Sequence, residues 1–246
     1  MRKDLYQEMY SQENYYWWHV AKRKTILSLL QPYTEKKTDL LFADMGCGTG
    51  KLMEDLAKFG KVEGFDTSQK ALAFCKKRGH QSLTKINISS TLPVKDNFFN
   101  IIIAADVLEH IQKEEGCISE FYRVLKGGGI LVVTVPAYPF LFSYWDKMLG
   151  HQRRYTKNSL ANKLVKAGFK IDKISYYNSF IFPVAIIFRT IKSLLSFSDG
   201  KPSSDFISLP APINKILLVV SGIERDLLKR INLPFGLSIV CVAEKE

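Results

Sequence analysis

Ala43-Asp44-Met45-Gly46-Cys47-Gly48-Thr49-Gly50 is the stretch that decides the fold, and glycine occupies every second position from Gly46 to Gly50. A short apolar run, Leu40 to Ala43, leads into it, and a segment of helical character begins at Leu52. Glycines at a strand-to-helix turn let the backbone approach a ligand closely, and the helix N-terminus presents free N–H groups. The spacing is G-x-G-x-G rather than the G-x-G-x-x-G of dinucleotide sites. With an acidic residue before the first glycine, it suits a ligand without a pyrophosphate whose aminoacyl part carries an ammonium group.

Apolar runs alternate with helical segments along most of the chain. We expect strands at 40–43, 62–65, 101–104, 130–135, 169–176 and 237–243, and helices at 11–30, 52–59, 69–78, 114–125 and 160–167. Gly60, Gly79 and Gly168 are expected as helix C-caps, Gly127 to Gly129 as a helix stop, and Thr156 as an N-cap. This alternation predicts an α/β fold: a Rossmann-like, doubly wound, mostly parallel seven-stranded sheet with helices on both faces.

The domain organisation expected is a single domain over 1–246 with two additions. Residues 1–36 form an N-terminal aromatic and basic helical cap, and 179–236 form a helical insert before the last strand. The insert has two amphipathic stretches, around Val184 to Leu195 and Ile213 to Leu228, joined by a Ser/Pro/Gly-rich loop. Three interpretations of it stay open: a lid over the acceptor, a membrane-docking element, or ordinary core and homodimer contact.

The charge balance bears on partners rather than on the fold. The net charge is +11, which is compatible with an anionic membrane surface, an acidic or phosphorylated substrate, or nucleic acid. The four cysteines are scattered without metal-ligand spacing, so neither a metal site nor a disulfide framework is expected. No secretory signal is seen, and the longest apolar run, Phe180 to Phe188, is far short of the ~20 residues of a membrane span. We expect a cytoplasmic protein, or one held peripherally at the inner face of the membrane.

A second acidic position follows the next expected strand. Asp66 comes directly after Val62 to Phe65, where a carboxylate can accept hydrogen bonds from both hydroxyls of a ribose. Alternatively, Asp66 caps the helix that begins at Gln69. Ser68 is available for that role, which favours the ribose interpretation.

Four segments, in order, resemble class I S-adenosylmethionine-dependent methyltransferases of the bacterial type 11/12 kind. Residues 41–50 are similar to the family's cofactor loop, and Leu92 to Asn100 to its L-P-F-x-D-x-x-F-D segment, with Asn100 in place of Asp. Residues 105–111 (ADVLEHI) and 123–129 (RVLKGGG) are similar to its V-L-E-H-I and R-V-L-K-P-G-G segments. Four matches in the right order are far more specific than one glycine loop.

The resemblance implies S-adenosylmethionine as cofactor and assigns residues to it. Gly46, Gly48 and Gly50 would line its methionine and ribose parts, Asp66 would hold the ribose hydroxyls, and the backbone at Ala105 would approach the methionine end. Asn87 stands where the family usually has an Asp that binds the adenine amino group, and its carbonyl oxygen can accept that bond. The implied cofactor-binding set is Asp44, Gly46, Cys47, Gly48, Gly50, Asp66, Thr67, Asn87, Ile88 and Ala105.

Two further segments resemble the same bacterial subgroup and are candidates for binding the acceptor. In the first, Tyr16-Trp17-Trp18-His19 with Arg23, we assign Trp18 and Arg23 to a lid helix, with Arg23 meeting a carboxylate. The alternative is an aromatic helix that packs on the sheet edge. In the second, Gly150 to Thr156, we assign Arg153, Arg154 and Tyr155 to an anionic group. The alternative is a solvated basic loop.

The predicted reaction is direct displacement at the sulfonium methyl group, with a small or lipid- or glycan-linked, anionic acceptor. His151 is the first candidate for a general base and His110 the second, if the acceptor must lose a proton. An RNA or protein methyltransferase, and a catalytically silent cofactor-binding or membrane adaptor module, remain alternatives. A nucleotide-dependent dehydrogenase is disfavoured by the glycine spacing.

Overall fold

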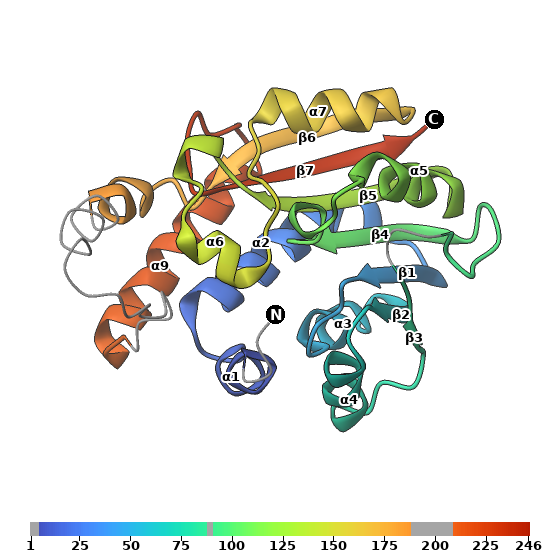
Figure 1. Ribbon diagram of the computed structural model, residues 1–246, viewed down its shortest axis with the longest axis horizontal. Helices are drawn as coiled ribbons and strands as arrows, with labels where there is room; N and C mark the ends of the chain where they lie inside the picture. The colour runs from blue at the N-terminus through green and yellow to red at the C-terminus, as the bar shows by residue number, and fades with distance from the viewer. Residues whose placement is uncertain (1–4, 88–90, 188–208) are drawn as a thin grey trace.

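A seven-stranded sheet forms the centre of the molecule, in the order β3-β2-β1-β4-β5-β7-β6 (Figure 1). The computed structural model describes residues 5–87, 91–187 and 209–246. The strands are β1 (Leu40–Met45), β2 (Gly60–Asp66), β3 (Leu83–Lys85), β4 (Phe99–Ala105), β5 (Leu125–Pro136), β6 (Phe169–Tyr177) and β7 (Ser238–Lys245). β7 runs antiparallel to β5 and β6, and the other neighbours are parallel. The predicted mostly parallel α/β sheet is confirmed.

Helices cover both faces of this sheet, as predicted. They are α1 (Leu5–Gln12), α2 (Trp17–Thr34), α3 (Lys51–Leu56), α4 (Gln69–Lys77), α5 (Glu114–Val124), α6 (Tyr144–Leu149), α7 (Lys157–Lys166) and α9 (Ala211–Leu228). Ile102 packs with the helices α5 and α7 on one face, while its neighbours Ile101 and Ile103 pack with α2 and α9 on the other (Figure 1). Successive side chains of a strand point to opposite faces of the sheet, and helices cover both faces. The buried strands are therefore apolar throughout.

Two expected glycine roles are wrong, and the structure gives the reason for each. Gly60 does not cap a helix: it begins β2, and a Cβ there would lie 2.2 Å from the carbonyl oxygen of Leu40 on the paired strand. The glycine is therefore needed for close approach of two strands. Gly127 to Gly129 do not stop a helix either, because β5 begins at Leu125 and includes them. Gly79 and Gly168 follow the ends of helices and Thr156 caps α7, as predicted.

The N-terminal helix expected over 11–30 is two helices instead. α1 ends at Gln12, and Tyr16, in an extended conformation, precedes the first residue of α2. The interruption lets α1 turn back onto α4, where the rings of Tyr10 and Phe74 lie 4.8 Å apart. The helix α6 and the strand β3 were not predicted, since both are short.

The described part of the insert contains the expected second helix. α9 meets the start of α2, where the backbone N–H of Trp17 donates to Asn214 Oδ1 at 2.9 Å. Residues 182–187 are also helical. The rest of the first amphipathic stretch, beyond Ile187, most of the connecting loop, and Ile88 lie outside the described residues. Among the helices that are described, none is long and apolar enough to span a membrane.

Candidate active site

The glycine loop between β1 and α3 has the backbone that its sequence predicts. Gly46, Gly48 and Gly50 have φ angles of +73°, +54° and +84°, in the left-handed region that glycine adopts at little cost. The N–H groups of Gly46 and Cys47 both donate to the carbonyl of Phe65, at 2.7 and 3.0 Å, which fastens the loop to β2. The loop is therefore a fixed turn at the carboxyl edge of the sheet.

Two buried carboxylates lie beside this loop. Asp44, at 2% exposure, has an Oδ2 atom without a hydrogen-bond partner among the described residues. Burial, reinforced by repulsion from Asp66, raises the pKa of Asp44 to about 7. Asp66 accepts from the backbone N–H of Gly48 at 3.0 Å and of Ser68 at 2.7 Å. A buried carboxylate oxygen without a donor indicates a place where a cationic or donor group binds.

The alternative role of Asp66 as a helix cap is filled by another residue. The side chain of Ser68 accepts from the N–H of Ala71 and caps α4. Asp66 therefore remains a candidate for the ribose hydroxyls.

The other cofactor candidates gather at the same edge of the sheet. Cys47 is buried, with its Sγ 3.7 Å from that of Cys75. Thr67 and Asn87 are exposed and follow the ends of β2 and β3. Ala105 is the last residue of β4, and the next residue, Asp106, has φ +56°. A left-handed non-glycine residue at such a point is a strained turn, and these turns cluster at functional sites.

The helix α1 lies over the glycine loop, which the sequence did not predict. A Cβ on Gly48 would approach Met9 Cε to 2.7 Å. Farther along, Glu13 accepts from Thr49 Oγ1 at 2.6 Å and forms an ion pair with Arg78. The amphipathic spacing of Tyr6, Met9, Tyr10 and Glu13 was the available signal, but nothing in the sequence fixes which surface this helix covers.

The aromatic segment at the start of α2 lies where this helix contacts α9. Trp17 is buried, and the half-buried Trp18 meets its ring edge-on at 5.3 Å. Arg23 does meet a carboxylate, but this is Asp55 on α3, at 3.0 Å. α1 rather than this segment lies against the glycine loop. α2 reaches the site edge through Lys22, which forms an ion pair with Asp106.

The assignment of Arg154 and Tyr155 to an anionic acceptor is not supported by their surroundings. Arg154 is buried and makes a two-pronged pair with Asp146 of α6, at 2.8 and 3.0 Å. The hydroxyl of the buried Tyr155 donates to Glu114, and Arg153 pairs with the same carboxylate. Because internal carboxylates occupy these donors, the segment fastens the loop after α6 to the core.

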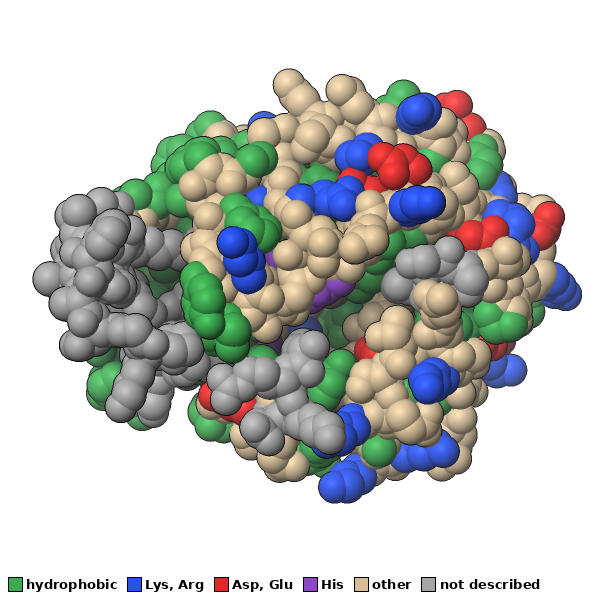
Figure 2. Space-filling model, viewed as in Figure 1, with side chains coloured by type: hydrophobic (Ala, Val, Ile, Leu, Met, Phe, Trp, Pro, Cys, Tyr) green, Lys and Arg blue, Asp and Glu red, His purple; other side chains and the backbone are tan. Residues whose placement is uncertain are grey.

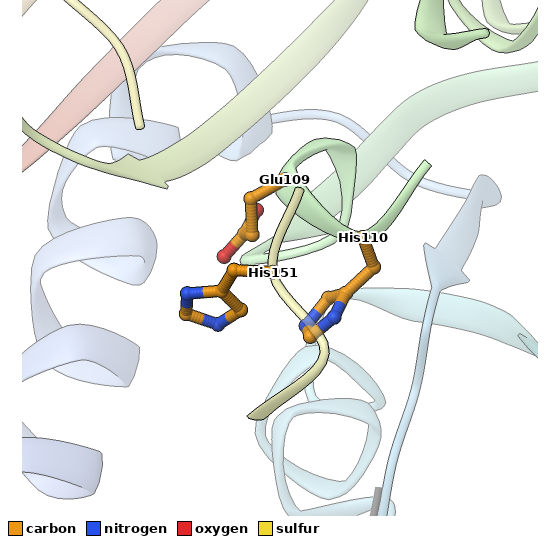
Figure 3. Close-up of side chains that lie close together, drawn as sticks. All are labelled: Glu109, His110 and His151. Atoms are coloured by element: carbon orange, nitrogen blue, oxygen red, sulfur yellow. The ribbon is translucent and has the colours of Figure 1, made fainter. Parts of the chain in front are cut away.

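The two candidate bases lie side by side. His110 belongs to a 3-10 turn, η1 (Leu108–His110), and its ring centre is 4.8 Å from that of His151. Glu109 of the same turn points towards them (Figure 3). Part of His110 is exposed, but desolvation and repulsion from His151 lower its pKa to about 4. Histidine side chains are visible at the floor of a hollow in this face of the molecule (Figure 2).

Comparisons with known proteins agree with this geometry. Residues 43–133 match a family described as "Methyltransferase domain". Over 127 residues the chain is 32% identical to a ubiquinone biosynthesis O-methyltransferase of Coxiella burnetii, covering 47% of this chain and 54% of that protein. A putative methyltransferase from Bacillus halodurans superposes with a TM-score of 0.58 at 22% identity, over 89% of this chain and 98% of that one. Residues 43–133 thus match a methyltransferase domain, and the chain has the fold of class I methyltransferases.

The sequence similarity to the curated relatives covers about half of this chain, and the chain spans about half the length of those relatives. The family match includes Asp44, Asp66 and His110, but not α1, His151 or α9. The [4+2]-cyclase SpnF has the same fold, with a TM-score of 0.57 at 22% identity over 90% of this chain and 81% of that one. A shared fold alone thus leaves the reaction open.

Proposed function

We propose that this methyltransferase transfers the methyl group of S-adenosylmethionine to a small or lipid- or glycan-linked, anionic acceptor. The main support for this cofactor is the Oδ2 atom of buried Asp44, which has no hydrogen-bond partner among the described residues and lies beside three left-handed glycines. The aminoacyl part of the cofactor supplies an ammonium group for that carboxylate, and its ribose supplies hydroxyls for Asp66. When bound, the cofactor supplies a methyl group already activated by its sulfonium charge.

The chain's own contribution is then to place the acceptor in line with that methyl group. The hollow that would receive the acceptor lies at the carboxyl edge of the sheet, where open α/β folds bind ligands. His151 is placed better than His110 to accept a proton, because Asp146 Oδ1 lies 2.9 Å from its Nδ1 and leaves Nε2 free. The net charge of +11 favours an anionic acceptor.

Asp66→Ala is expected to weaken binding of S-adenosylmethionine by about 1–3 kcal/mol, because ribose hydroxyls lose a charged acceptor. Isothermal titration calorimetry measures this, with NAD as the comparison ligand for both proteins. Ser68→Ala is the matched control: it removes the cap of α4 and should leave affinity nearly unchanged. Binding of NAD in place of S-adenosylmethionine by the unmodified protein would remove the proposed function.

We also propose that the insert binds to a membrane surface, and its described part supports this. On α9, Ile216, Val219 and Ile223 share one face and expose 61%, 58% and 60% of their surface. A helix with exposed apolar residues on one face and basic residues beside them is typical of binding at a lipid interface. Lys215 and Arg225 on this helix and Lys229 and Arg230 just after it are basic, with Arg225 and Lys229 also paired with Asp226.

Ile216→Ser combined with Ile223→Ser is therefore expected to abolish co-flotation with liposomes that contain anionic lipid. Each basic residue near such a surface contributes about 1 kcal/mol, so binding should also weaken with salt and with neutral lipid. Val165→Ser, an equally exposed apolar position on α7, is the control and should float like the unmodified protein. No flotation with any lipid composition leaves the insert as an acceptor lid or a protein contact.

A further inference from the structure

Glu109 carries a buried carboxylate without a hydrogen-bond partner among the residues that the structure describes. It is 0% exposed, and neither Oε1 nor Oε2 has a hydrogen-bond partner among the described residues. Such a group costs free energy unless a cation or a donor reaches it. Its backbone is held in place independently, since its carbonyl accepts from the N–H of Gln152 at 2.6 Å. The carboxylate therefore stays free while the turn around it is fixed.

Two imidazoles stand next to this carboxylate. One ligand atom each from Glu109, His110 and His151 can be chosen so that all three lie within 4.8 Å of one another (Figure 3). Two imidazole nitrogens and one carboxylate oxygen form a donor set that suits divalent transition metals such as zinc, whereas magnesium and calcium prefer oxygen ligands alone.

The outer contacts of both imidazoles match those of metal-binding histidines. Such a histidine nearly always gives its second ring nitrogen to a carboxylate or a backbone carbonyl, which fixes the tautomer. Here His151 Nδ1 lies 2.9 Å from Asp146 Oδ1, and His110 Nδ1 lies 3.3 Å from the carbonyl of Gly150. Asp146 is itself held by Arg154. Both Nε2 atoms are thus left available on the side away from these partners.

We propose that Glu109, His110 and His151 form a binding site for a divalent transition-metal ion of the zinc class. The three protein ligands would leave a coordination position for water or for an oxygen of the acceptor, as in open metal sites. An ion there would lower the pKa of a coordinated hydroxyl. His151 would then act as a ligand rather than as a base. The proposal concerns metal binding and does not depend on the proposed transfer reaction.

Cobalt(II) titrated into the metal-stripped full-length protein tests the site. We expect one equivalent to bind, with visible d–d absorption and without a thiolate charge-transfer band. The absent band separates this site from the Cys47–Cys75 pair, whose sulfur atoms also lie close together. Zinc should displace the cobalt in the same stoichiometry.

Glu109→Gln keeps the shape of the side chain and is expected to weaken cobalt affinity at least about tenfold, a loss that changes in metal shells commonly produce. His151→Asn gives a second measurement should Glu109→Gln fail to fold. His80→Gln, a histidine whose ring contacts the Gly50 carbonyl, is the control and should bind cobalt unchanged. Unchanged affinity in a folded Glu109→Gln or His151→Asn protein, or a thiolate band, would overturn the proposal.

Discussion

Replacing Arg154 with alanine is expected to lower the free energy of unfolding by about 3–5 kcal/mol, the usual cost of breaking a buried ion pair from one side. Asp146 is 0% exposed, and Arg154 makes two hydrogen bonds to it. Burial alone would raise the pKa of Asp146, yet the hydrogen bonds from His151 and Arg154 hold it below its ordinary range. Without the guanidinium, a charged carboxylate would stay buried with fewer partners.

Urea denaturation of the unmodified protein and of Arg154→Ala measures this loss of stability. Arg225→Ala is the matched control, because Arg225 pairs with an exposed aspartate on the surface of α9 and such pairs contribute about 0–1 kcal/mol. Arg154→Lys should recover only part of the stability, since lysine cannot form the two-pronged contact. A change below about 1 kcal/mol for Arg154→Ala would show that Arg154 is free to bind a ligand, as the sequence had suggested.

Arg154 also shows where sequence reasoning reached its limit. The basic character of the Gly150 to Thr156 loop was evident, but its carboxylate partners were not. Glu114 lies 41 positions before Tyr155, and Asp146 lies on a helix too short to predict. Whether an arginine is available for a ligand depends on such contacts across the fold, which no local pattern encodes.

The cofactor loop was predictable because its structure is local. A strand, three glycines and a helix follow one another within Leu40 to Leu56, so spacing alone indicates the turn and its left-handed residues. By contrast, Met9 of α1 and Glu13 just after it lie against the loop, and Glu13 pairs with Arg78 at the end of α4, far away in sequence. Gly60 was predicted as a helix cap because the local sequence pattern does not show that the backbone of Leu40 packs closely against it.

Asp44→Asn is expected to produce two opposite effects. The ligand-free protein should be more stable above neutral pH, and the affinity for S-adenosylmethionine should be lower. The folded state raises the pKa of Asp44 from 3.8 to about 7. Between those values the folded protein holds a proton that the unfolded chain has released, so stability falls as pH rises through this window. Within this window the free energy of unfolding falls by about 1.4 kcal/mol for each pH unit. Asparagine does not titrate, so the variant should lack this loss.

Binding should change in the other direction. If the cofactor's ammonium group lies against Asp44, removing the carboxylate's charge costs about 2–5 kcal/mol, as for other buried charge pairs. In the unmodified protein the affinity should rise with pH through about 7 as Asp44 ionises. Thermal unfolding with and without S-adenosylmethionine, from pH 5 to pH 9 in steps of about one unit, records both effects in one series.

Asp96→Asn is the control for this series, since Asp96 is exposed and pairs with Arg123 at the surface. It should shift neither the slope of stability with pH nor the stabilisation by ligand. An Asp44→Asn protein that keeps the same pH slope would mean that Asp44 is ionised in the free protein, with a donor to hold it. Unchanged affinity together with a flattened slope would place the ammonium group elsewhere, because a neutral amide cannot replace a carboxylate as the partner of a buried cation.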